Sequence, residues 1–135
     1  MACPYFEPTK LRVEVPPLLP LRDFWSGLCH AQAPAFQPDE HLLTECCNMG
    51  YARGKCARFP AGPGPDAVRF QIASDSGGMI LVSFSTEANH HPHSHGSLKY
   101  SREAGRFIAG HPDAVIEKLA EAYVAGYLRR RPAAA

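Results

Sequence analysis

The five cysteines of this 135-residue chain all lie within its first 56 residues, and the remainder contains none. They are Cys3, Cys29, Cys46, Cys47 and Cys56. Any disulfide framework or metal centre that they build therefore belongs to the N-terminal half of the fold. Five is an odd number, so complete pairing into disulfides leaves one thiol over. A cytosolic compartment keeps thiols reduced, and there such a set of cysteines indicates metal or redox chemistry.

Four of these cysteines meet the requirement of a four-thiolate metal centre. We expect the ligands to be Cys3, Cys29, Cys47 and Cys56, with Cys46 packing as a small hydrophobic side chain. Four thiolates bind either a tetrahedral zinc ion or an iron–sulfur cluster. Zinc sites usually contain two cysteines separated by about two to four residues, and this chain has no such pair. The spacing therefore favours a 4Fe-4S cluster, in which each thiolate binds its own iron, with zinc as the alternative.

The choice of Cys47 over Cys46 rests on helix geometry. Adjacent residues on a helix point about 100° apart, so both sulfurs rarely bind one metal. Cys47 is closer to the expected end of its helix at Gly50, where the chain turns back toward Cys56. Aromatic residues near the cysteines in sequence are expected to screen a cluster from water: Phe6, Phe24, Trp25, Tyr51 and Phe59. Backbone amides near Gly27, Gly50 and Gly54 are expected to donate hydrogen bonds to the sulfurs.

A second group of potential ligands is the histidine-rich segment 89–96. It contains His90, His91, His93 and His95, and on an extended backbone the last three project from one side. Pro92 and Ser94 predict a turn, so we interpret the segment as a solvated tip without a dedicated metal site. A cysteine such as Cys29 paired with one of these histidines would instead define a thiol enzyme.

The hydrophobic pattern predicts a single α+β domain over residues 1–135. Residues 1–65 are expected to form an irregular, cysteine-rich metal-binding lobe, and residues 66–131 a sheet with a C-terminal helix. From Val68 onward the apolar residues alternate, which predicts an antiparallel meander of three strands or slightly more, with polar turns at 75–78 and 89–96. A helix from about residue 112 to 130 carries an apolar stripe and is expected to cover one face of the sheet.

The N-terminal lobe contains weaker signals of regular structure. Residues 11–15 alternate as in a short strand, and residues 21–29 suit a short buried turn or helix. Asp39 is the expected N-cap of a helix that ends at Gly50, and residues 51–65 are rich in glycine and proline, as in a loop.

Charge and the start of the chain narrow the expected location and partners. The formal net charge is only +1, so we favour no nucleic-acid partner. The first residues lack the basic and apolar regions of a signal peptide, and no stretch reaches the roughly 18 apolar residues of a membrane span. We therefore expect a cytoplasmic protein without membrane contact. The alanine- and arginine-rich ending is typical of a GC-rich, bacterial genome.

Together these features favour a small iron–sulfur protein that transfers electrons to a redox or protein partner or senses redox state. A zinc-stapled binding module without redox chemistry is the first alternative, and a cysteine–histidine thiol enzyme is the second. The sequence favours a protein that is not an enzyme by itself.

Overall fold

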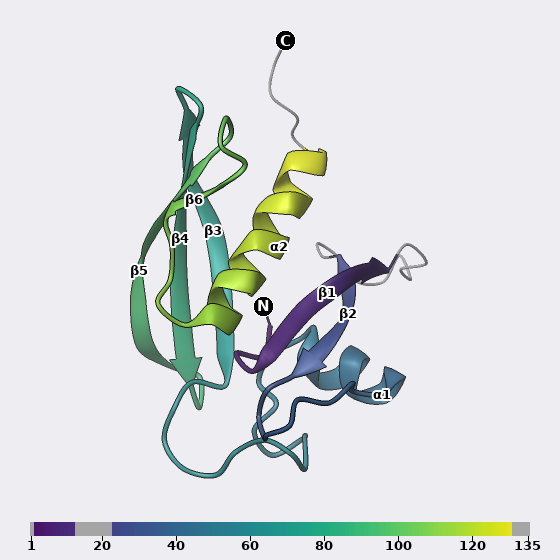
Figure 1. Ribbon diagram of the computed structural model, residues 1–135. Helices are drawn as coiled ribbons and strands as arrows, with labels where there is room; N and C mark the ends of the chain where they lie inside the picture. The colour runs from purple at the N-terminus through teal and green to yellow at the C-terminus, as the bar shows by residue number, and fades with distance from the viewer. Residues whose placement is uncertain (1, 13–22, 131–135) are drawn as a thin grey trace.

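The structure, a computed structural model, describes residues 2–12 and 23–130. It is an α+β fold with two antiparallel sheets and a C-terminal helix (Figure 1). Strands β1 (Phe6–Arg12) and β2 (Phe24–Cys29) form the smaller sheet. The larger sheet contains four strands in chain order: β3 (Ala67–Ser76), β4 (Met79–Ala88), β5 (His91–Ser101) and β6 (Arg106–Ala109). The remaining elements are α1 (Glu40–Leu42), the π-helical turn η1 (Leu43–Cys47) and α2 (Ala114–Arg130).

The larger sheet has one more strand than the three-stranded meander expected, because β6 was not predicted. Its first two turns need only two residues each, and both residues of each turn have positive φ: Gly77 and Gly78 at 62° and 79°, Asn89 and His90 at 53° and 64°. Such tight turns match the right-handed twist of the paired strands. The expectation of a polar turn over 89–96 is therefore wrong: the turn is complete at His90, and His91 already pairs with Ala88 in β4.

Helix α2 lies between the two sheets, as Figure 1 shows. The Asp113 carboxylate accepts hydrogen bonds from the backbone N–H groups of Val115 and Ile116, at 2.9 and 3.2 Å, and so caps the helix at its start. Ala120 and Val124 pack with buried residues of the four-stranded sheet, which confirms that the helix covers one face of it. The first turns of α2 instead join the hydrophobic cluster that contains most of the cysteines.

The smaller sheet replaces the turn or helix expected over residues 21–29. Phe24 to Cys29 forms strand β2, and its partner β1 begins at Phe6, earlier than the strand expected over 11–15. Residues 13–15 of that expected strand lie outside the described residues. Gly27 allows β2 to approach β1 closely, because a Cβ at this position would collide with the backbone carbonyl of Glu7. Aromatic residues at the start of β2 also favour strand over helix.

The cysteine-bearing helix begins as predicted but is not regular. Asp39 is its N-cap and accepts a hydrogen bond from the Leu42 N–H at 2.9 Å. After only three α-helical residues the chain widens into η1, in which the Asn48 N–H donates to the Leu43 carbonyl, five residues back, at 3.1 Å. Residues 51–65 form the loop that the sequence predicts. None of the helices in the described part of the chain has the length and apolar character needed to cross a membrane.

One carboxylate ties the far end of the larger sheet to α2. Asp75 of β3 accepts hydrogen bonds from the Arg102 guanidinium at 2.6 and 3.2 Å, and from the Tyr127 hydroxyl at 2.6 Å. These donors, Arg102 first, lower the pKa of Asp75 below its ordinary value of 3.8. The group therefore stabilises the fold above pH 3.8, and this contribution is lost as the pH falls through its folded-state pKa.

Replacing Asp75 with asparagine should lower the free energy of unfolding at pH 7, because Arg102 exchanges a bidentate ion pair for a hydrogen bond to a single neutral acceptor. Urea unfolding of both proteins from pH 7 to pH 3 measures the effect. The difference should begin to shrink below pH 3.8, because Asp75 of the unfolded chain then binds a proton while the folded-state carboxylate, whose pKa is lower, still does not. A difference that stays constant across this range would contradict the assignment.

Candidate functional site: a cluster of five thiols

Five free thiols from four separate segments lie in the N-terminal lobe. Cys3 precedes β1, Cys29 ends β2, Cys46 and Cys47 end η1, and Cys56 lies in the loop that follows. The first four are buried and Cys56 is partly exposed. Cys3, Cys46 and Cys47 belong to one hydrophobic cluster, and Cys56 packs against it.

Backbone pairing brings these segments together. The Cys3 N–H donates to the Cys47 carbonyl at 3.1 Å, which joins the chain start to the end of η1. Cys29 is the register partner of Phe6 in the β1–β2 sheet, and Phe6 follows Cys3 by three residues. Ala52 is 1% exposed and accepts a hydrogen bond from the Cys56 N–H at 2.8 Å, so the loop that carries Cys56 is anchored in the core. Cys3 and Cys56, more than 50 positions apart in sequence, thus lie in or against the same hydrophobic cluster.

The thiols of Cys47 and Cys3 have raised pKa values because they are buried close to other cysteines. Burial raises the pKa of its thiol, and the four other cysteines raise it further. Burial likewise raises the pKa of Cys3 to about 12, with contributions from Cys29, Cys56 and Cys46. Burial also raises the pKa of Cys46, and Cys56, its hydrogen-bond partner, raises it further. Both neighbours, Cys46 and Cys47, thus interact with Cys3 and Cys56.

Two sulfurs receive backbone hydrogen bonds, though not from the glycines expected. The Ala31 N–H donates to Cys29 Sγ at 3.4 Å, and the Tyr5 N–H donates to the sulfur of Cys3 and lowers its pKa against the effect of burial. Gly50 instead donates to the Cys46 carbonyl, because its positive φ serves the tight turn after η1. Positive charge is also close, since Lys55 and Arg58 lower the pKa of Cys46 and Cys29 respectively.

Four of the five expected aromatic residues pack in the same cluster as the cysteines. Phe6 and Phe24 are buried within it, and Trp25 and Phe59 pack against it. Tyr51 differs: its hydroxyl donates to Glu87 at 2.5 Å, and its ring stacks on His90 with centroids 4.3 Å apart. Tyr51 therefore links the lobe to the four-stranded sheet.

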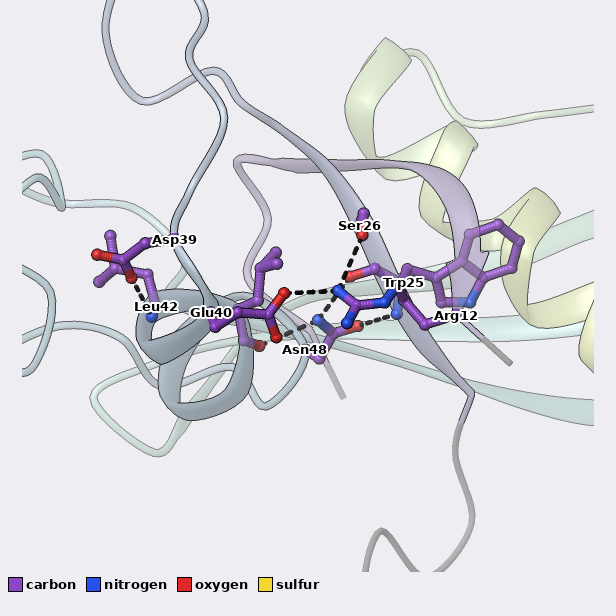
Figure 2. Close-up of polar contacts among 8 residues, drawn as sticks. Arg12, Trp25, Ser26, Asp39, Glu40, Leu42 and Asn48 are labelled. Carbon is purple, nitrogen blue, oxygen red and sulfur yellow. Dashed lines mark hydrogen bonds and ion pairs between the residues drawn. The ribbon is translucent and has the colours of Figure 1, made fainter. Parts of the chain in front are cut away.

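The side chain of Asn48, directly after Cys47, fixes the cysteine helix to strand β2 (Figure 2). Its Oδ1 accepts a hydrogen bond from the Trp25 N–H at 3.0 Å, and its Nδ2 donates to the Trp25 carbonyl at 3.0 Å. The same Nδ2 donates to the Leu43 carbonyl at 3.0 Å, which holds the wide turn of η1. The sequence analysis missed this residue. Its signal was an asparagine at a helix end, where its side chain competes for backbone groups.

The histidines occupy places separate from the thiols. His91, His93 and His95 lie on β5, and His93 Nδ1 is 3.2 Å from the Thr86 hydroxyl. Over residues 2–12 and 23–130, no three cysteine, histidine, aspartate or glutamate side chains are grouped so that they could hold one metal ion.

Comparison of the chain with models of protein families, with curated proteins and with solved structures gives no match.

Replacing Asn48 with alanine should lower the free energy of unfolding by about 1–3 kcal/mol, because partly buried backbone groups of Trp25 and Leu43 lose their partners. Urea unfolding followed by Trp25 fluorescence measures the change, since Trp25 is the chain's single tryptophan. Gln32→Ala, which removes an exposed amide, is the matched control and should change stability little. Equal effects of the two substitutions would show that the Asn48 bonds add nothing.

Replacing His91 and His93 together with alanine should leave both folding and bound metal unchanged, because these side chains are exposed on β5 and no metal-binding group includes them in the described chain. Metal content by mass spectrometry and far-UV circular dichroism provide the two measurements. Loss of a stoichiometric metal from a folded double variant would establish the histidines as ligands.

Proposed function

We propose that this protein is a small iron–sulfur protein in which Cys3, Cys29, Cys47 and Cys56 bind a 4Fe-4S cluster. The observation that supports this most is that free thiols from the chain start, from η1 and from the following loop lie in or against one hydrophobic cluster. Cysteines that form disulfides would be bonded in pairs, whereas all five cysteines here are free thiols. A buried thiol that serves only as a small hydrophobic side chain would not need other thiols near it. A group of unpaired thiols in one lobe is the donor set of a thiolate-bound metal centre.

The spacing of the thiols favours a cluster over a single ion. Zinc would draw four sulfurs to within about 2.3 Å of one centre, and no three side chains in the described residues are grouped in that way. A cubane is larger and each of its irons takes one cysteine, so its ligands stand further apart. Thiols that come from the chain start, a strand end, a helix end and a loop fit that demand.

The surroundings support an anionic centre. Four thiolates concentrate negative charge in a buried lobe, and this is costly unless it is compensated. The cations of Lys55 and Arg58 act on two of the cysteines, and N–H groups of Tyr5 and Ala31 point at two sulfurs. Hydrogen bonds to the sulfurs and burial are the means by which a protein sets a cluster's reduction potential. Bound here, a cluster would supply one-electron chemistry for redox transfer or redox sensing.

The thiol-enzyme alternative has less support. A nucleophilic cysteine needs a lowered pKa, from a cation or from an adjacent base. Burial raises the pKa of Cys3, Cys29 and Cys47, and within the described residues no hydrogen bond joins a histidine to a cysteine. We therefore propose a non-enzymatic redox protein, located in the cytoplasm, where free thiols persist, and serving a redox or protein partner.

Anaerobic purification followed by iron, zinc and acid-labile sulfide analysis tests the proposal. We expect brown protein with about four iron and four sulfide atoms per chain. Cys47→Ser should lose them and Cys46→Ser should keep them, because Cys47 but not Cys46 is a proposed ligand. The two substitutions are adjacent and chemically identical, so each controls for the other.

Circular dichroism of both variants separates loss of the cluster from loss of the fold, and Cys29→Ser provides a second ligand variant. Colourless protein with one zinc per chain would establish the zinc-binding module instead. Metal-free protein in which Cys29 reacts rapidly with an alkylating reagent would establish the thiol enzyme.

A further inference from the structure

Next to residues that adjoin the thiols in sequence lies a large cleft lined by both sheets and by helix α2. Its volume is about 990 Å³, at the upper end of the range for small-molecule sites. Residues of β1 and β2, of β3, β4 and β5, and of α2 line it. Ala2, Asn48 and Met49 form the end nearest the cysteines, so sequence neighbours of Cys3 and Cys47 line it.

Aromatic rings are the main chemical feature of the cleft. Trp25, Phe70, Phe84 and Tyr123 line it from four different elements, and the rings of Phe70 and Tyr123 lie with centroids 5.6 Å apart. Gly96 makes room for Phe84, because a Cβ there would lie 2.8 Å from its ring. Rings that face a cavity from several sides favour flat aromatic ligands, which they contact by stacking and edge-to-face packing.

Trp25 is held in place before any ligand arrives. Asn48 binds both backbone polar groups of Trp25 at 3.0 Å and leaves the indole free. Figure 2 shows the indole extending away from Asn48 on the side of α2. Asn48 therefore fixes the backbone position from which the Trp25 side chain reaches the cleft.

The charged residues of the cleft are already paired within the protein. Arg130 lies 3.6 Å from Asp23, which also accepts from Arg129, and Arg69 lies 2.8 Å from Glu87. A phosphate or carboxylate on a ligand would have to compete with these ion pairs. The cleft therefore favours a ligand without charge.

From these features we propose that the cleft binds an uncharged molecule with a flat, conjugated ring. A ligand bound here would lie against the residues next to Cys3 and Cys47. If the proposed function is correct, that is the place for an electron donor or acceptor, and a quinone is an uncharged, flat-ring class with that chemistry; this last identification rests on the proposed function.

Trp25 makes the test direct, because the only tryptophan of the chain lines the cleft. The probe is duroquinone, an uncharged quinone whose fully substituted ring resists addition by the free thiols. We expect saturable quenching of Trp25 fluorescence at one duroquinone per chain. Isothermal titration calorimetry supplies a second reading that does not depend on fluorescence.

Two substitutions on α2 form a matched pair. Ala122 lines the cleft and Ala125 does not, and both are partly exposed. Ala122→Phe should fill the cleft and weaken duroquinone binding at least tenfold, whereas Ala125→Phe should leave it unchanged. Equal binding by both variants, or quenching that does not saturate, would overturn the proposal. Tighter binding of flavin mononucleotide, which carries a phosphate, would overturn the assignment of an uncharged ligand.

Repeating the titration on iron-free Cys47→Ser protein separates the two proposals. Binding there should persist, because the cleft wall contains Asn48 and Ala2 and no cysteine. Duroquinone binding to a protein that never holds iron would retain the aromatic site and refute the iron–sulfur function. An iron-loaded protein that fails to bind duroquinone would refute the aromatic site and retain the iron–sulfur function.

Discussion

The three hydrogen bonds of the Asn48 side chain hold together the part of the molecule on which both proposed sites depend. Asn48 follows Cys47 at the end of η1, and its amide binds both backbone groups of Trp25 in β2. One side of this contact positions Cys47 relative to Cys29, which ends the same strand. The other side presents the Trp25 indole to the cleft. A partly buried amide that satisfies three backbone groups is costly to remove, because each group left unpaired loses its hydrogen bond without regaining water.

The buried thiols contribute to the packing of the N-terminal lobe. Burial keeps Cys3 and Cys47 protonated, so they pack as small hydrophobic side chains beside Phe6 and Phe24. Binding of the proposed cluster would require thiols to lose their protons, at a cost in binding free energy. The Ala31 N–H and the cations of Lys55 and Arg58 favour the thiolate form of Cys29 and Cys46. Burial and these polar groups therefore act on the thiol cluster in opposite directions.

The lobe is tied to the rest of the fold by charged and aromatic contacts as well as by its core. Tyr51, just after the turn that ends the cysteine helix, bonds to Glu87 and also accepts a hydrogen bond from Arg69 at 3.0 Å. Helix α2 contributes Ile116 and Leu119 to the hydrophobic cluster of the cysteines. The same helix packs Ala120 and Val124 on the four-stranded sheet. Helix α2 thus packs against both the thiol cluster and the four-stranded sheet.

The sequence by itself determined the elements whose signals are local. Asp39 predicted the start of a helix, and Gly77 with Gly78 predicted a tight hairpin turn. The apolar stripe after Pro112 predicted the long helix. Capping, positive φ and periodicity all depend on residues that are close together in the chain. Cysteine composition also identified the lobe that holds the thiols. The tertiary structure alone decided the rest. Strand β2 formed because β1 offered it a partner, β5 began at His91 because a two-residue turn sufficed, and Asn48 gained its role because Trp25, 23 residues earlier in the chain, lay within reach. These outcomes depend on long-range pairing, and no local pattern in the chain specifies which distant segment will supply the partner.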